Sequence, residues 1–263
     1  MTEPDHFDAL RNKRLRYVES ARENGFEEGL RSLLAELYPD NAHFIYELLQ
    51  NAEDAQATIV EFQLTDDALT VSHDGVRTFS LADIESITGI GNSTKRDDET
   101  QIGKFGVGFK AVFAYTTRPE IRSGEFAFAI ADLFIPEQID GTSPKGRTVF
   151  TFPFNRAEKP IEVARAEVER GLRELDAKTL LFLNNIREIT YELPSGDVGF
   201  VTREDLDDLT IRMEASQDEA FVESTWLRLV GPTSTTQEGQ QPHTVAVAFK
   251  LEPRETGSGR ATG

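Results

Sequence analysis

Apolar residues recur at two spacings along this chain of 263 residues, and each spacing predicts one kind of element. Spacings of three and four residues indicate amphipathic helices. Helices are expected over 7–23, 26–37, 41–55, 80–87, 106–115 and 161–175. Alternation of apolar and polar residues indicates strands. Strands are expected near 58–64, 69–71, 118–123, 125–131, 147–152, 186–193, 198–201, 208–213, 219–230 and 244–251.

The segments between these elements are of two kinds. Residues 88–101 carry few apolar side chains and are predicted to form a long mobile loop, a length that is uncommon in compact domains unless the loop is functional. Residues 136–146 are also predicted to form a loop. Two further segments, 231–243 and 252–263, are rich in Gly, Pro, Ser, Thr and Gln and are predicted to be disordered.

The helix containing F-I-Y-E-L-L-Q-N-A-E-D-A, residues 44–55, carries candidate chemistry. Residues three and four apart are neighbours on a helix, so Glu47, Asn51 and Asp54 are expected near one face. Phe44 and Leu48 flank them with apolar surface. The arrangement offers a base, a metal ligand and an acid in one row, although an ordinary amphipathic surface helix can show the same pattern.

A glycine-rich run, I-G-K-F-G-V-G-F-K-A, occupies residues 102–111. Its glycines, Gly103, Gly106 and Gly108, stand directly ahead of an apolar helical pattern. Flexible backbone that leads into the start of a helix directs several N–H groups at one point, which suits an anion. A glycine-rich turn alone is weak evidence, but its pairing with an E-x-x-x-N helix upstream is a strong signal.

Together the two motifs resemble those of the GHKL (Bergerat-fold) ATPases. The helix motif is similar to the N box of that superfamily, and I-G-K-F-G-V-G-F resembles the glycine motif at the end of the lid in its large heat-shock chaperones. R-P-E-I-R-S-G and L-L-F-L-N-N-I-R-E-I resemble sequences of the sacsin-like group. The part of the chain that carries the two main motifs covers about residues 24–155, and the rest matches more loosely.

The resemblance implies an α+β fold. It is a two-layer α/β sandwich over residues 1–178, with a mixed, mostly antiparallel sheet, helices on one face, and ATP bound between the helices and the lid. Beyond residue 178 the pattern turns β-rich. We therefore expect a β-rich extension over 179–252 and a disordered tail over 253–263.

The resemblance also implies roles for the helix residues. Glu47 matches the glutamate that takes a proton from the attacking water, and Asn51 matches the asparagine that binds Mg²⁺. Asp54 falls on the same nucleotide-facing side. Histidine kinases of the superfamily usually have asparagine in place of Glu47, so the glutamate favours hydrolysis over phosphate transfer to histidine.

The adenine-reading motif departs from the family pattern. The family uses aspartate two positions before glycine, to accept from the exocyclic amine. Aligned on Gly75, that position holds His73, and Asp74 comes one place late. Asp74 is the preferred residue for contacting adenine, because a carboxylate is the stronger acceptor for an amine. The alternatives are that His73 contacts the base through a ring nitrogen, or that Asp74 is an ordinary turn aspartate without a role in binding. Thr148 stands near the family's G-T motif, where a plain strand threonine is equally expected.

The remaining candidates are predicted to face the phosphates. Lys104 and Lys110 are weaker candidates because lysines are normally exposed. The expected contacts in the predicted lid and after it are Ser93, Thr94, Lys95, Gly103, Phe105, Gly106, Val107, Gly108 and Phe109.

Composition narrows the class of protein. The formal charge of −18 opposes direct binding to nucleic acid or anionic lipid, because such binding depends on Lys and Arg. Without cysteine there is no disulfide framework and no thiolate metal site. The first residues lack the apolar core of a signal peptide, and no apolar run is long enough to cross a membrane. A cytoplasmic protein is expected.

Together with the motif residues, the resemblance implies a slow, Mg²⁺-dependent ATPase whose lid closes on ATP and drives a conformational change or dimerisation. The expected partners are ATP and ADP, together with a second copy, further C-terminal domains or another protein. A nucleotide-gated interaction module that binds ATP with little hydrolysis is the alternative. A structural domain without nucleotide is the third reading, and it requires the motifs to have arisen by chance.

Overall fold

The structure is a computed structural model that describes residues 3–25, 43–89, 108–144, 146–217, 220–232 and 244–252. The predicted helix over 26–37 lies outside these ranges, as does most of the predicted lid, residues 88–103. None of the helices in the described part is long and apolar enough to cross a membrane.

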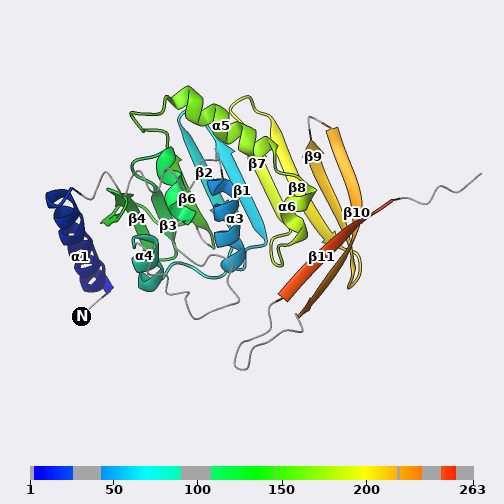
Figure 1. Cartoon of the computed structure of the whole chain (residues 1–263), viewed down its shortest axis with the longest axis horizontal. Helices are drawn as coiled ribbons and strands as arrows, with labels where there is room; N and C mark the ends of the chain where they lie inside the picture. Colours follow the sequence, from blue (N-terminus) through cyan, green and yellow to red (C-terminus); the bar gives the residue numbers. More distant parts are fainter. Residues whose placement is uncertain are drawn as a thin grey trace, which may run out of the picture.

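The described strands form a single 11-stranded sheet (Figure 1). Its order is β11-β10-β9-β8-β7-β1-β2-β6-β3-β4-β5, and every neighbouring pair among these strands is antiparallel except β1 and β7. The bounds are β1 Ile59–Leu64, β2 Ala68–His73, β3 Glu120–Ser123, β4 Phe126–Ala131, β5 Ile135–Gln138, β6 Thr148–Pro153, β7 Glu188–Glu192, β8 Val198–Asp205, β9 Thr210–Gln217, β10 Ala220–Pro232 and β11 Thr244–Leu251. The predicted mixed, mostly antiparallel sheet is confirmed.

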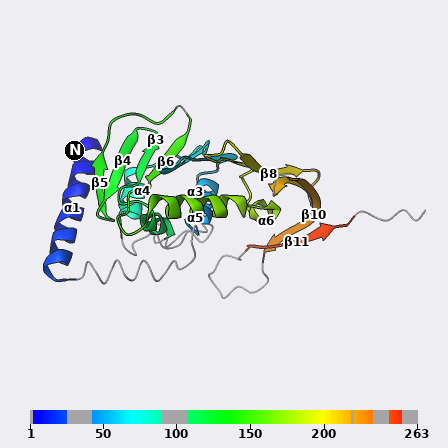
Figure 2. The ribbon, with the colours of Figure 1, turned by 90° about the horizontal axis from the view of Figure 1, so that it is seen from above.

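Most of the described helices cover one face of this sheet. Figure 2 shows α3, α4, α5 and α6 on the same side, with α1 standing beside β5 at the edge. The bounds are α1 Glu3–Glu23, α3 Phe44–Asp54, α4 Leu81–Ile87, α5 Ile161–Arg173 and α6 Ala177–Leu181, with a 3₁₀ helix, η2, over Gly108–Ala114. The arrangement is an α/β structure in which the sheet dominates.

The hairpin of β1 and β2 follows from its alternating pattern. Val60, Phe62 and Leu64 are buried beneath the helices, while the residues between them face outward. Phe62 pairs with Val71 across the two strands, so the apolar faces of both strands coincide. The hairpin predicted from residues 58–71 is confirmed.

The short helix α4 begins at the predicted cap. The Ser80 side chain accepts from the Asp83 backbone at 3.3 Å, and the Asp83 carboxylate accepts from the Ser80 backbone at 2.8 Å. This reciprocal capping box satisfies two N–H groups that the first turn of the helix leaves without partners. The predicted cap is confirmed.

One prediction about local structure was wrong, and one predicted helix is of a different type. Residues 135–138 form strand β5, where the sequence predicted a loop from residue 136. Pro136 removes a ladder donor, which is tolerated here because β5 is at the sheet edge. The described part of the helix expected over 106–115 is a 3₁₀ helix. In addition, α6 was not predicted.

Phenylalanine rings fill the space between α3 and the sheet. The rings of Phe44 and Phe152 lie 6.1 Å apart edge to face, and Phe109 lies 6.1 Å from Phe150. Phe44, Phe150 and Phe152 are almost completely buried. This packing fixes the position of α3 over the centre of the sheet, since burial of aromatic rings dominates core energetics.

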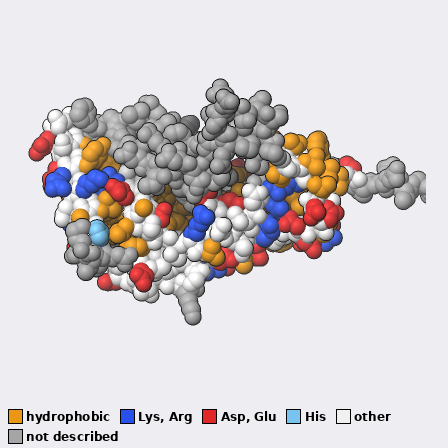
Figure 3. Space-filling model, turned by 90° about the horizontal axis from the view of Figure 1, so that it is seen from below, with side chains coloured by type: hydrophobic (Ala, Val, Ile, Leu, Met, Phe, Trp, Pro, Cys, Tyr) orange, Lys and Arg blue, Asp and Glu red, His pale blue; other side chains and the backbone are white. Residues whose placement is uncertain are grey.

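The extension continues the same sheet. β7 pairs in parallel with β1, and β8, β9, β10 and β11 follow in chain order. Figure 3 shows apolar side chains gathered at this end of the molecule. On β11 they are Val245, Val247, Phe249 and Leu251, all exposed. The domain boundary at residue 178 remains a prediction.

Candidate functional site

Helix α3 presents Glu47 and Asn51 from its polar side. Its opposite side is buried through Phe44, Ile45 and Leu48. The Glu47 side chain is 22% exposed, and its Oε1 lies 3.7 Å from His43 Nε2. Asn51 is also partly buried. The two side chains therefore lie at the boundary between the core and the surface, where a polar group can meet a ligand.

The end of the glycine run lies directly against Glu47. A Cβ atom placed on Gly108 would stand 1.9 Å from Glu47 Oε2 and 2.3 Å from Cδ, so any side chain there would displace the carboxylate. Gly108 opens η2, and Phe109 follows it into the aromatic core. The structure thus joins two motifs that are 61 positions apart in sequence at one point.

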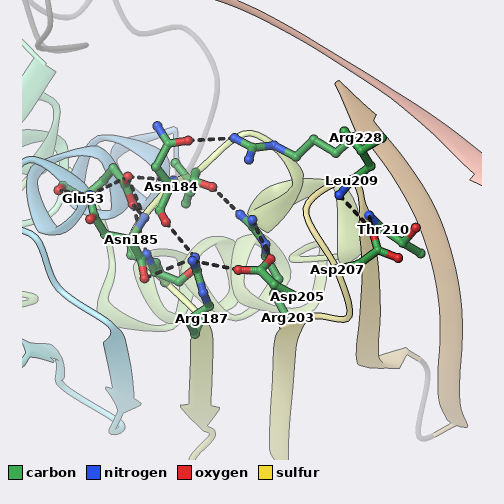
Figure 4. A network of polar contacts seen from close by, with 12 residues as sticks. Glu53, Asn184, Asn185, Arg187, Arg203, Asp205, Asp207, Leu209, Thr210 and Arg228 are labelled. Carbon is green, nitrogen blue, oxygen red and sulfur yellow. Dashed lines mark hydrogen bonds and ion pairs between the residues drawn. The ribbon is translucent and has the colours of Figure 1, made fainter. Parts of the chain in front are cut away.

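The far end of α3 is held by a second carboxylate, Glu53 (Figure 4). Glu53 is 5% exposed. Its Oε1 accepts from the Asn184 backbone at 2.7 Å and from Asn185 Nδ2 at 2.8 Å, and Oε2 accepts from the Ile186 backbone at 3.1 Å. These donors belong to the run L-L-F-L-N-N-I-R-E-I. The helix that carries Glu47 is therefore anchored to the loop before β7.

The same loop connects α3 to the extension. Asn184 Oδ1 accepts from Arg228 Nη2 of β10 at 2.7 Å. Arg203 of β8 donates to the Leu183 carbonyl and pairs with Asp205 at 2.7 Å. Figure 4 shows these side chains converging between α3 and the strands of the extension. Sequence reasoning missed this network, because its members are distant in sequence and each has an ordinary local pattern.

Asp74, just after β2, is committed to the start of β1. Its Oδ1 accepts from the backbones of Thr58 at 2.7 Å and Ile59 at 2.9 Å, and its Oδ2 accepts from Thr58 Oγ1 at 2.5 Å. Burial alone would raise the pKa of Asp74, but these hydrogen bonds outweigh it and hold the pKa below its usual value. The carboxylate fixes the turn that leaves β2.

His73, the last residue of β2, is 3% exposed. Its Nδ1 accepts from the Gly75 backbone at 3.1 Å. Burial lowers its pKa to about 4 against the opposing charge of Asp74, so the imidazole is neutral near pH 7. Gly75 lies against the end of α3, where a Cβ atom would stand 2.8 Å from the Ala55 carbonyl oxygen.

Thr148 lies beside His73, because the two residues pair directly across β6 and β2. Thr148 Oγ1 lies 2.6 Å from Ser123 Oγ, which also accepts from the Phe79 backbone at 3.0 Å. All three members of the row His73, Thr148 and Ser123 are buried. Sequence reasoning did not include Ser123, whose place in the row depends on strand register.

Lys110 was expected at the surface and is instead buried. Its Nζ donates to the Ile87 carbonyl at 2.7 Å and to the Leu133 carbonyl, and it lies 4.9 Å from the centre of the Phe134 ring. Burial and, to a smaller extent, the nearby charge of Arg14 together lower its pKa to about 7. Lys110 thus joins η2 to the end of α4.

Most of the other residues that were predicted to contact the phosphates lie outside the described part of the chain. Ser93, Thr94, Lys95, Gly103, Phe105, Gly106 and Val107 lie outside the described residues. Asp54 is partly buried on the last turn of α3. Among the residues that the structure describes, no three His, Asp or Glu side chains gather as a metal site.

Comparison with known families gives a match in the middle of the chain. Residues 63–149 match the family model described as "Sacsin domain". This range includes β2 and the whole glycine run, and it begins within β1. The predicted resemblance to the sacsin-like group is supported over this part of the chain.

Two relatives are much longer than this chain. "Protein NO VEIN" of Arabidopsis thaliana is 27% identical over an alignment 263 positions long. The alignment covers 88% of this chain and 9% of that protein. "Sacsin" of Homo sapiens is 35% identical over 111 residues, which cover 35% of this chain and 2% of that protein. The chain therefore spans less than a tenth of the length of either relative.

Two solved structures are loosely similar. The B-subunit of the DNA gyrase from Myxococcus xanthus has a TM-score of 0.46 at 13% identity, covering 80% of this chain and 70% of that chain. The N-terminal domain of a DNA repair protein has a TM-score of 0.42 at 15% identity, covering 64% of this chain and 53% of that chain.

Proposed function

We propose that this chain is a nucleotide-binding domain that hydrolyses ATP slowly with Mg²⁺. The observation that carries the proposal is the contact between the Glu47 carboxylate and the Gly108 backbone. This contact places the candidate base next to the end of the glycine run. Hydrolysis of a terminal phosphate requires a base and phosphate-binding backbone close to each other. The Sacsin domain match supports the same assignment.

In this proposal Glu47 is the general base. Its side chain is partly exposed, so a water molecule can reach it, and its position on a well-anchored helix holds the carboxylate in one place. Glu47 takes the proton of the attacking water. The backbone N–H groups of Gly108 and Phe109 are the candidate donors to the phosphates.

Asn51 is the proposed protein ligand of Mg²⁺. Mg²⁺ is commonly bound by few protein ligands together with phosphate and water oxygens, so a single amide oxygen from Asn51 would suffice. Because Gly108 has no Cβ, the Glu47 carboxylate lies directly against its backbone, one helical turn before Asn51. When bound, the ion neutralises the charge of the phosphates. Contacts from the lid remain predictions.

Association with a partner is part of the proposal. The exposed apolar side chains of β11 lie on the edge strand of the sheet, and surfaces of this kind commonly mediate association. A second copy, a following domain or another protein would cover them. The proposed nucleotide cycle would then act on that contact through the network between α3 and β10.

The proposal is tested by calorimetry with ATP, with and without Mg²⁺, and by phosphate release. Glu47→Gln should bind ATP about as well as the wild type and release phosphate on the order of 100-fold more slowly, because only the base is removed. Glu162→Gln is the matched control, since Glu162 is an exposed acid in the first turn of α5. It should behave like the wild type.

Three other results would change the assignment. Tight binding with negligible release by both the wild type and Glu47→Gln would favour the nucleotide-gated module. Absence of binding by the wild type would reject the nucleotide site. Equal slowing by Glu162→Gln would show that the effect is one of net charge.

A further inference from the structure

The buried imidazole of His73 has a defined proton position. A backbone N–H can only donate, and the Gly75 N–H donates to His73 Nδ1. Nδ1 therefore holds a lone pair, and the proton of the neutral ring is on Nε2. The lowered pKa agrees with this assignment, because the neutral form persists well below pH 7.

The Nε2–H group is left without a partner among the described residues. His73 is nevertheless 97% inaccessible, since only 3% of its surface is exposed. Among the described residues, Nε2 is not one of the atoms that are both fully buried and unpartnered, so this donor keeps some access to the surroundings, where a ligand or water can accept from it. The neighbouring Thr148 and Ser123 hydroxyls use one proton for their mutual bond and have one left to donate.

The position of this donor matches the base end of the proposed nucleotide. His73 reaches Ala55 at the end of α3 through Gly75. Glu47 is eight residues before Ala55, which corresponds to about 12 Å along the axis of α3. If the terminal phosphate lies at Glu47, the buried row at His73 meets the purine edge that is farthest from the ribose, which carries N1.

We propose that His73 reads the base as a donor, from Nε2–H to the unprotonated N1 of adenine. This inference rests on the proposed nucleotide site. It differs from recognition by a carboxylate, which accepts from the exocyclic amine, and Asp74 already accepts three hydrogen bonds at the start of β1. The chain would select adenine by excluding bases that carry a proton on N1. The exocyclic amine of adenine would contribute little to the binding affinity.

The test compares ATP, purine riboside triphosphate, which lacks the amine, and inosine triphosphate, which carries a proton on N1. By calorimetry with the wild type, purine riboside triphosphate should bind within about threefold of ATP, and inosine triphosphate at least about tenfold more weakly. His73→Asp, which presents an acceptor, should reverse the order of the two analogues. His6→Asp, at an exposed histidine on α1, is the matched control and should keep the wild-type order.

The outcomes separate the two proposals. Binding of none of the three nucleotides by the wild type would reject the nucleotide site itself. Strong binding of ATP with loss of purine riboside triphosphate would overturn the donor role while leaving the site intact. Equal weakening of all three by His73→Asp would assign His73 a structural role only. The wild-type series needs no variant, so poor folding of His73→Asp would not prevent the decision.

Discussion

Two glutamates on α3 occupy opposite kinds of environment. Glu53 is buried and accepts from the backbones of residues 184–186 and from an amide side chain, so its lone pairs are largely used. Glu47 is partly exposed, lies 3.7 Å from His43 Nε2, and faces the bare backbone of Gly108. Both residues are glutamates on one helix, yet their surroundings prepare them for different tasks.

The difference shows how a structural acid can be separated from a candidate catalytic acid. A carboxylate surrounded by fixed donors stabilises the fold but cannot readily accept a proton or meet a substrate. A carboxylate with unused lone pairs beside a close backbone can do both. The anchored end of α3 therefore holds the reactive end in place, which is the support that a positioned base needs.

The largest expected effect comes from removing the anchor. Glu53→Ala leaves several buried N–H groups without acceptors and should lower the free energy of unfolding by at least about 3 kcal/mol. Glu47→Ala should lower it by less than about 1 kcal/mol, because Glu47 is partly exposed and has few partners. Urea denaturation of both variants measures the difference. Similar losses in the two variants would break the comparison between the two ends of α3.

Local pattern was sufficient for the elements that surround this helix. Alternation placed the apolar face of β1, and Ser80 with Asp83 marked the start of α4, because both depend on residues close in sequence. The loop predicted over 136–146 begins instead as strand β5, and Pro136 is tolerated there because β5 is at the edge of the sheet. Local rules therefore fail where the outcome depends on position in the sheet.

The environments of the two glutamates could not be read from local pattern. Glu53 meets Asn184 across 131 positions, and helical spacing alone cannot say which acid turns toward that loop. The nearness of Glu47 to the glycine run was implied by a family resemblance. Ser123 and the burial of Lys110 needed strand register and tertiary packing, so neither was foreseen.

A second prediction addresses the reactive end alone. Gly108→Ala places a Cβ atom 1.9 Å from Glu47 Oε2, but a flexible side-chain end can move away. Stability should change by less than about 1 kcal/mol, while ATP hydrolysis should fall by about tenfold or more as the base is displaced. Gly231→Ala is the control, because a Cβ atom there meets no atom within 4 Å. Unchanged hydrolysis in Gly108→Ala would remove Glu47 from the proposed mechanism.

The smallest expected effect concerns Lys110. This buried cation allows the buried carboxylate of Glu53 to be compared with a buried group of positive charge. Like Glu53 it has fixed partners, but they are two neutral carbonyls and aromatic rings, so its charge is incompletely compensated. Burial lowers its pKa from 10.5 to about 7. Between these values the unfolded chain binds more protons than the folded one, so Lys110 adds stability as pH rises and loses it as pH falls toward 7.

This sign gives a measurable difference between variants. From pH 7.5 to pH 8.5, the free energy of unfolding of the wild type should rise relative to Lys110→Met by about 1 kcal/mol, up to a limit of about 1.4 kcal/mol per pH unit. Other titrating groups cancel in this comparison because both proteins contain them. Lys178→Met, at an exposed lysine on α6, should follow the wild type across the range. Parallel curves for the wild type and Lys110→Met would contradict this prediction. They would show that hydrogen bonds to uncharged groups stabilise the buried Lys110 cation as well as they stabilise the Glu53 carboxylate.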